Sequence, residues 1–232
     1  MAKNLLSSAV FAGLIAGLIA ALLQFLFVIP LLLEGEMYES GARVHFLVDG
    51  MTQSDKNRPG LGNEWGRHLM TVGFNVVTYT GYALLLVAAM GYAREKTGLS
   101  ITARRGLLWG FCGFIAVQLA PAAGLPPELP GTPAAELAPR QIWWFATIIA
   151  TGFGLALIAF GKTLPAHILG LTAILLPHFI GAPHLDTYFG IAPPELSAEF
   201  ATISLGVALI GWSLLGYFSG YFFDRGDNWH VN

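Results

Sequence analysis

The chain has 232 residues, of which 55% are hydrophobic and only 11% are charged, against roughly 25% charged residues in an average soluble domain. Its formal net charge of -2 argues against a nucleic-acid-binding protein, which would carry clustered Lys and Arg. The single cysteine, Cys112, excludes a disulfide within the chain and a cysteine-rich metal site. The composition is that of a membrane protein.

Six stretches of the chain contain no Asp, Glu, Lys or Arg, and we expect each of them to form a helix. A helix of roughly 20 residues crosses a hydrocarbon core of about 30 Å, and each stretch is long enough to do so. The predicted fold is therefore an all-α polytopic membrane protein, a single membrane domain over residues 1–232 with a bundle of six transmembrane helices. The stretches are residues 4–33, 68–93, 106–127, 141–161, 163–185 and 200–223.

The helix count depends on the fourth and fifth stretches, which Lys162 alone separates. Here "GKTLP" offers a turn glycine, Thr163 as an N-cap and Pro165 in the first helical turn, which favours two helices in a tight hairpin. A bundle of five helices follows if this hairpin is shallow. In the first stretch Gly13 and Gly17 lie four residues apart, a spacing that lets helices approach closely in lipid.

The basic residues of the loops predict the orientation in the membrane. With the N-terminus inside, seven Lys and Arg residues fall on the cytoplasmic side and five on the outer side, in agreement with the positive-inside rule. We therefore predict that both termini are cytoplasmic. The two sets are Lys3, Arg94, Lys96, Arg104, Arg105, Lys162 and Arg225 inside, and Arg43, Lys56, Arg58, Arg67 and Arg140 outside.

Most acidic residues then fall in the outer loops, of which residues 34–67 form the longest. We expect this arrangement to make the outer surface attractive to cations. The acids concerned are Glu34, Glu36, Glu39, Asp49, Asp55, Glu64, Glu128, Glu136, Asp186, Glu195 and Glu199.

A polar stripe, which we define as Glu64, His68, Thr71, Asn75, Thr78 and Tyr82, begins just before the second stretch and continues into it. Steps of three and four residues place these side chains on one helical face. The stripe has two interpretations: hydrogen bonding between helices, with His68 at the outer interface, or the wall of a polar pathway. Both predict that the stripe faces protein, and we expect the opposite face, with Leu69, Val72, Val76 and Leu86, to be the more exposed to lipid.

The segment "LPHFIGAPHLD" gathers His178, His184 and Asp186 near the outer end of the fifth stretch, where Gly181 and Pro183 break the helix. Imidazole and carboxylate are suitable ligands for divalent Co, Ni or Zn. A metal site is one interpretation, with His68 as a further ligand from the same side of the membrane. An interfacial histidine without a metal is the other.

The residues also bear on haem binding and on enzymatic activity. A haem could use His68 and His178 as axial ligands if both lie near the outer surface. The chain contains no Gly-rich phosphate loop, no HExxH and no Gly-x-Ser-x-Gly turn, so it lacks the sequence patterns of the corresponding enzymes. We expect no catalytic residues and no permanently bound cofactor.

Several segments taken together resemble the CbtA family of probable cobalt transporter subunits. They are "AGLIAGLIAALLQFLFVIPLLLEGEMYE", "ARRGLLWGFCGF", "LAPAAGLPPELPGTPAAELAPRQIWW" and "LLPHFIGAPH", in order and across nearly the whole chain. The resemblance implies a multi-pass protein of the bacterial inner membrane that takes up divalent cobalt for cobalamin synthesis. It also implies a partner, a small single-helix membrane subunit that bears histidine and is called CbtB.

One departure from the family concerns the first outer loop. Members of the family often carry a His-rich run there, whereas this chain has His45 followed by "DGMTQSDKNRPGLGNEWGRH". The alternative of a structural accessory subunit in a larger membrane complex therefore stays open. On the transport hypothesis, the outer acids concentrate the cation, His178 and His184 exchange its water for imidazole, and the polar stripe provides onward contacts.

Overall fold

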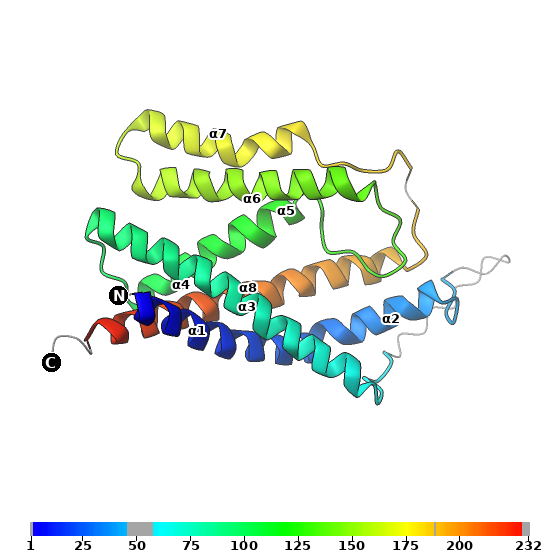
Figure 1. Ribbon diagram of the computed structural model, residues 1–232. Coiled ribbons are helices and arrows are strands. Elements are labelled where there is room, and N and C mark those ends of the chain that lie inside the picture. The colour runs from blue at the N-terminus through cyan, green and yellow to red at the C-terminus, as the bar shows by residue number, and fades with distance from the viewer. Residues whose placement is uncertain (1, 46–57, 188, 229–232) are drawn as a thin grey trace. The chain divides into compact units, whose positions relative to one another are not determined.

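The computed structural model describes residues 2–45, 58–187 and 189–228, and every regular element within these ranges is a helix (Figure 1). The elements, with η for a π-helical segment, are α1 (Ala2–Leu23), η1 (Gln24–Val28), α2 (Ile29–Glu39), α3 (Trp65–Thr97), α4 (Ala103–Phe114), η2 (Ile115–Leu119), α5 (Ala120–Ala122), α6 (Leu137–Phe160), α7 (Leu164–Ile180) and α8 (Pro194–Asn228). The all-α fold predicted from the sequence is confirmed.

Within the described residues, five helical segments are long and apolar enough to cross a membrane: Asn4–Glu39, Trp65–Thr97, Ala103–Ala122, Leu137–Phe160 and Pro194–Gly226. The sixth, α7, is apolar but has only 17 residues, which corresponds to roughly 25 Å at 1.5 Å per residue. The chain is therefore a multi-pass membrane protein with five to six spanning helices.

The chain divides into two compact units. The first comprises Met1–Phe25, Asn63–Phe114 and Gly206–Asn232, and the second comprises Leu26–Gly62 and Ile115–Leu205. The single membrane domain expected from the sequence stays a prediction, and each unit is described by itself.

In the first unit, α1 packs against α3 through glycines. A Cβ atom on Gly17 would lie 2.8 Å from Cα of Val76 and 2.9 Å from the carbonyl oxygen of Asn75, and one on Gly13 would overlap with the backbone of Thr80. Such contacts are possible only where the side chain is a hydrogen atom, because backbones approach closely at small residues. The packing role predicted for Gly13 and Gly17 is confirmed.

The pairing of α4 with α8 in the same unit also relies on glycine from both helices. A Cβ atom on Gly106 would overlap with the carbonyl oxygen of Gly216, and one on Gly110 with that of Trp212. Thr102, just before α4, lies next to Gly220 near the end of α8. Since the beginning of α4 contacts the later part of α8, the two helices are antiparallel.

A hydrogen bond of 2.9 Å joins Nδ2 of Asn4 to the carbonyl oxygen of Gly226. It places the beginning of α1 beside the end of α8 within the first unit. Two chain ends on the same side of a membrane require an even number of crossings, so this contact favours the six-helix count over five. It also fits the part of the prediction that places both termini on the same side of the membrane, and the cytoplasmic side stays a prediction.

In the second unit, α6 and α7 form an antiparallel hairpin around Gly161–Thr163. Gly154 and Gly170 contact each other at its centre, where a Cβ on Gly170 would lie 2.8 Å from the carbonyl oxygen of Gly154. The side chain of Thr163 accepts a hydrogen bond of 3.4 Å from the backbone N–H of Ala166. The N-cap predicted from the sequence is confirmed.

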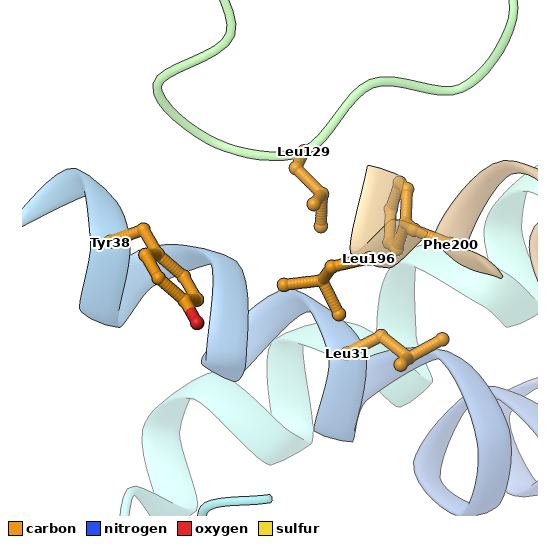
Figure 2. Packing of buried hydrophobic residues seen from close by; sticks show 5 residues of the cluster. All are labelled: Leu31, Tyr38, Leu129, Leu196 and Phe200. Carbon is orange, nitrogen blue, oxygen red and sulfur yellow. The ribbon is translucent and has the colours of Figure 1, made fainter. Parts of the chain in front are cut away.

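The second unit also contains an apolar cluster, defined as Leu31, Tyr38, Leu129, Leu196 and Phe200. Figure 2 shows Leu31 and Tyr38 on α2, Leu129 on the loop between α5 and α6, and Leu196 and Phe200 at the beginning of α8. All five side chains are buried. The cluster joins three segments that are far apart in the sequence.

The π-helical segments η1 and η2 each stand directly before a helix with proline in its first turn, Pro30 in α2 and Pro121 in α5. Proline has no N–H to donate and its ring crowds the preceding turn, and a widened turn relieves this crowding within a helix. The chain passes from one unit to the other between Phe25 and Leu26, inside η1, and between Phe114 and Ile115, where η2 begins.

The outer loop predicted over residues 34–67 is shorter than expected, because α2 continues to Glu39 and α3 begins at Trp65. A charge-free run marks the apolar part of a helix rather than its end. Here Tyr38 packs in the apolar cluster and Glu34 is ion-paired with Arg43, so the helix extends past its acidic residues. Residues 46–57, with Asp49 and Asp55, lie outside the described part of the chain.

Candidate functional site

The end of α7 carries His178, the first of the predicted metal ligands. Its half-buried imidazole lies edge-on to the indole of Trp143 on α6, with ring centroids 5.9 Å apart and an interplanar angle of 74°. The preceding residue, Pro177, is buried. Its carbonyl oxygen accepts two hydrogen bonds of 3.0 Å, one from Nε1 of Trp143 and one from the backbone N–H of Gly181.

Trp143 also lies where two proline-rich segments meet. A Cβ atom on Gly124, in the loop after α5, would lie 2.5 Å from Cη2 of Trp143 and 2.8 Å from Cβ of Ala182, in the loop after α7. The segments "LAPAAGLPPEL" and "LPHFIGAPHLD" are therefore in contact at this point. The side chain that joins the two segments is the buried indole of Trp143.

Sequence reasoning missed this role, because a tryptophan near a helix end is expected to anchor the helix at the membrane interface. A signal was present in the spacing. Trp143, Thr147, Thr151 and Gly154 follow one another at steps of four, four and three, and these are the buried residues of α6. In an apolar helix, a face of small and hydroxyl-bearing residues is typical of helix–helix packing.

His184 and Asp186 follow the helix break that the sequence predicted. Helix α7 ends at Ile180, and Gly181 has a φ of 86°, a conformation that favours glycine. Both His184 and Asp186 are exposed in the loop that follows. Among the residues that the structure describes, no three His, Cys, Asp or Glu side chains are grouped so as to hold a metal ion.

The predicted ligands are divided between the two units: His178, His184 and Asp186 belong to the second, and His68 belongs to the first. Neither the metal site nor the haem alternative, which needs His68 and His178 together, is tested by this division. Both stay predictions.

Among the residues that the structure describes, Glu34, Glu128 and Glu199 are outer acids with an arginine partner in the second unit. Glu34 pairs with Arg43 at 3.0 Å, Glu128 pairs with Arg140 at 2.6 Å, and Glu199 pairs with Arg58. The Glu34–Arg43 pair is almost buried, with side-chain exposures of 9% and 12%. An acid neutralised by an adjacent guanidinium attracts a free cation only weakly. These three glutamates therefore contribute little to the outer surface that was predicted to attract cations.

The polar stripe of α3 belongs to the first unit, and Asn75 is its buried member. Nδ2 of Asn75 donates to Oε1 of Gln24 in η1 at 2.9 Å and to the carbonyl oxygen of Thr71 at 2.9 Å. The expectation that Asn75 faces another helix is confirmed. Gln24, which the sequence did not single out, is its partner.

Two other members of the stripe make aromatic contacts. The imidazole of His68 is half-buried and lies edge-on to Phe25, with centroids 5.4 Å apart. Tyr82 is stacked on Trp212 of α8 at 4.6 Å. Thr71 is half-buried, and its hydroxyl donates to the carbonyl oxygen of Arg67 at 3.0 Å.

The predicted exposure of the two faces of α3 was wrong at several positions. Glu64 and Thr78 of the stripe are exposed, whereas Leu86, assigned to the lipid-facing side, is only 8% exposed. Leu86 follows Asn75 by eleven residues, about three helical turns, and so lies on the same face. Leu69 is 70% exposed as expected.

The two valines assigned to the lipid-facing side lie between these extremes. Val72 and Val76 are both half-buried, and Val76 packs against Gly17 of α1. The contact face of α3 is therefore broader than the polar stripe.

The chain was compared with known proteins. A family described as "Probable cobalt transporter subunit (CbtA)" matches residues 2–224, so the resemblance seen in the sequence is confirmed across nearly the whole chain. No curated protein matches the chain. No solved structure matches it either.

Proposed function

Because the chain belongs to the CbtA family of probable cobalt transporter subunits, we propose that it is the multi-pass subunit of a cobalt uptake system in a bacterial inner membrane. The uptake would serve cobalamin synthesis. The observation that carries the proposal is the family match over residues 2–224. The retained "LPHFIGAPH" segment, with His178 held at a helix end, supports it.

His178, His184 and Asp186 are proposed as the first ligands of the incoming ion. Divalent cobalt accepts imidazole and carboxylate, and it is the cargo rather than a resident cofactor. The exposed His184 and Asp186 can meet a hydrated ion, and the half-buried His178 can take it closer to the helices. Replacing water ligands by imidazole in this way needs no nucleotide.

The partner is proposed to be a small single-helix membrane subunit that bears histidine, as CbtB does in systems of this kind. The description of the family as a subunit supports a partner. Its histidine would complete the coordination that His178 and His184 begin.

The onward contacts are proposed to be polar side chains of α3. His68, Thr71, Asn75 and Tyr82 each have partly or fully buried side chains, and polar groups at membrane depth are costly enough to suggest a functional reason. Glu64 is exposed at the beginning of the stripe and Thr78 is exposed within it. Both can meet a partner or water.

Cobalt uptake tests the proposal. We expect cells that produce this chain with its partner to accumulate radiolabelled cobalt, and the double variant His178→Ala, His184→Ala to lose roughly tenfold or more in uptake at sub-saturating cobalt, because changes around metal ligands cost about 10- to 100-fold in affinity. His167→Ala is the matched control, since His167 lies in the first turn of the same helix and is hydrogen-bonded to the carbonyl oxygen of Thr163. Uptake unchanged in the double variant would remove these histidines from the mechanism.

The accessory-subunit alternative makes a different prediction. Purification in a gentle detergent followed by mass measurement would then give a stoichiometric assembly with a larger membrane enzyme, formed equally with and without cobalt. The haem alternative predicts a Soret band in membranes enriched in the protein. Uptake that depends on His178, together with neither of these results, would separate the transport proposal from both.

A further inference from the structure

We propose that Trp143 is a positioning residue for His178, which it holds at the angle and depth needed to receive the cation. This inference rests on the proposed function of His178 as a ligand. It comes from three contacts of the indole in the second unit: a hydrogen bond to the backbone, a ring contact with the imidazole, and packing against Gly124.

The hydrogen bond fixes the backbone beside His178. Proline within a helix removes a hydrogen bond and weakens the turn around it, and Pro177 stands within the last turn of α7. The carbonyl oxygen of Pro177 is nevertheless bonded to two N–H donors, the indole of Trp143 from the side and Gly181 from beyond the helix end, each at 3.0 Å. The lateral bond ties the end of α7 to the beginning of α6.

The ring contact restricts the imidazole itself. The edge-on arrangement, with centroids 5.9 Å apart at 74°, is a favourable aromatic geometry. It leaves His178 half-buried and blocks the side on which the indole lies. The side chain therefore loses part of its rotational freedom before an ion arrives, and this preorganisation favours binding.

Trp143 is itself held in place. Its side chain is buried, its Nε1 is hydrogen-bonded to the carbonyl oxygen of Pro177, and Gly124 lies so close that a Cβ there would be 2.5 Å from the ring. The indole cannot shift toward Gly124 or rotate freely. The contacts that restrict His178 thus run from Gly124 through Trp143.

The next residue provides a matched control. Trp144 is half-buried, and its indole contacts the ring of Phe145, at 5.0 Å between centroids. Trp143→Phe keeps an aromatic ring and removes the N–H donor, and Trp144→Phe makes the same chemical change on a neighbouring face of α6. A general effect of losing an indole from this helix would appear in both variants.

The test measures initial rates of cobalt uptake against cobalt concentration in cells that produce the full chain with its partner. We expect Trp143→Phe to raise KM for cobalt by about two- to tenfold, the range for one hydrogen bond, with little change in maximal rate per molecule. Trp144→Phe should behave as the parent. Membrane abundance and the thermal unfolding temperature of each variant show whether the protein has folded.

Double variants separate positioning from stability. Adding Trp143→Phe to His178→Ala should have no further effect on KM, because the indole acts through the imidazole, and this non-additivity is the signature of coupled residues. If Trp143→Phe does not accumulate in the membrane, Gly124→Ala replaces it: the added methyl group displaces the indole while retaining its N–H, and KM should again rise.

The experiments distinguish a failure of the positioning role of Trp143 from a failure of the ligand role of His178. A KM unchanged by both Trp143→Phe and Gly124→Ala, or effects that add to that of His178→Ala, would overturn the positioning role alone. Uptake that does not respond to His178→Ala would overturn the ligand role of His178 and the positioning role with it.

Discussion

The amide pair of Gln24 and Asn75 illustrates how single polar residues are accommodated in this chain. Each amide on its own would place unpaired donors and acceptors in an apolar environment, at a cost that depends on the partners available. The bond of 2.9 Å between them pairs a donor of Asn75 with the acceptor oxygen of Gln24. Gly17 allows it, because a Cβ atom there would lie 2.9 Å from the carbonyl oxygen of Asn75.

We expect Asn75→Ala to lower the free energy of unfolding in detergent by about 0.5–2 kcal/mol, the range for hydrogen bonds between membrane helices. Thr78→Ala is the control on the same helix, since Thr78 is exposed, and it should change little. Denaturant or thermal unfolding of the purified variants provides the measurement.

The pairing itself is tested by combining Asn75→Ala with Gln24→Ala. If the two amides depend on each other, the double variant will be destabilised by less than the sum of the single variants. Strictly additive losses, or an equal loss in Thr78→Ala, would contradict the importance of the pair.

The ion-paired acids show the same dependence on neighbours for charged residues. Glu128 and Glu199 are counted as acidic loop residues in the sequence, yet each has an arginine against it that comes from a separate segment. The charge available to an approaching cation is therefore smaller than the number of outer acids indicates. Such pairs connect loops to helix beginnings in the second unit.

At the scale of elements, glycines allow helices of the first unit to approach one another closely. Gly106 and Gly110 on α4 face Gly216 and Gly220 on α8 so closely that the backbones are in contact. In a membrane, where lipid and side chains are equally apolar, close backbone approach is a main source of helix association. This explains how α4 and α8 pack with their backbones in contact.

Gly110→Ala should therefore lower the free energy of unfolding by about 1–3 kcal/mol, the usual cost of inserting a methyl group into a packed contact. The added Cβ would overlap with the carbonyl oxygen of Trp212, and that backbone cannot move without shifting α8. Unfolding of the purified protein in detergent, followed by circular dichroism, measures the effect.

Gly152→Ala is the matched control for this prediction, because Gly152 also lies within a long helix, and a Cβ atom added there would have no neighbouring atom within 4 Å. Alanine is the better helix former by about 1 kcal/mol, so this variant should be neutral or slightly more stable. Equal destabilisation in both variants would show that the close contact at Gly110 is not the cause of the loss.

At the scale of the whole molecule, the topology makes a prediction about accessibility. In a variant with Cys112→Ala, a cysteine at Glu136, before α6, should react with a membrane-impermeant maleimide in intact cells. A cysteine at Lys162, between α6 and α7, should react only after the cells are permeabilised. Both positions are exposed, so neither is protected by protein.

The reverse pattern would contradict the predicted orientation, with both termini in the cytoplasm. Failure of Lys162→Cys to react under either condition would indicate a shallow hairpin buried in lipid, and so five crossings. The hydrogen bond between Asn4 and Gly226 argues for six, because five would separate the two ends of the chain.

The sequence by itself determined the class of the protein, the approximate positions of the helices and the family. These properties are local or cumulative: charge-free runs of spanning length, breaks at proline and glycine, and motifs in order along the chain. The N-cap at Thr163 and the helix end at Gly181 were predicted for the same reason, since the residues that form them are neighbours in the sequence.

Only the tertiary structure decided which faces of the helices meet. A soluble helix reveals its buried face by hydrophobic periodicity, but a membrane helix is apolar on both its lipid side and its protein side, so periodicity carries little information. Leu86 was assigned to the wrong face, and the contacts Gln24–Asn75 and Trp143–Pro177 were not foreseen. Each of these contacts joins segments at least 34 residues apart, and close packing, not sequence pattern, selects the partners.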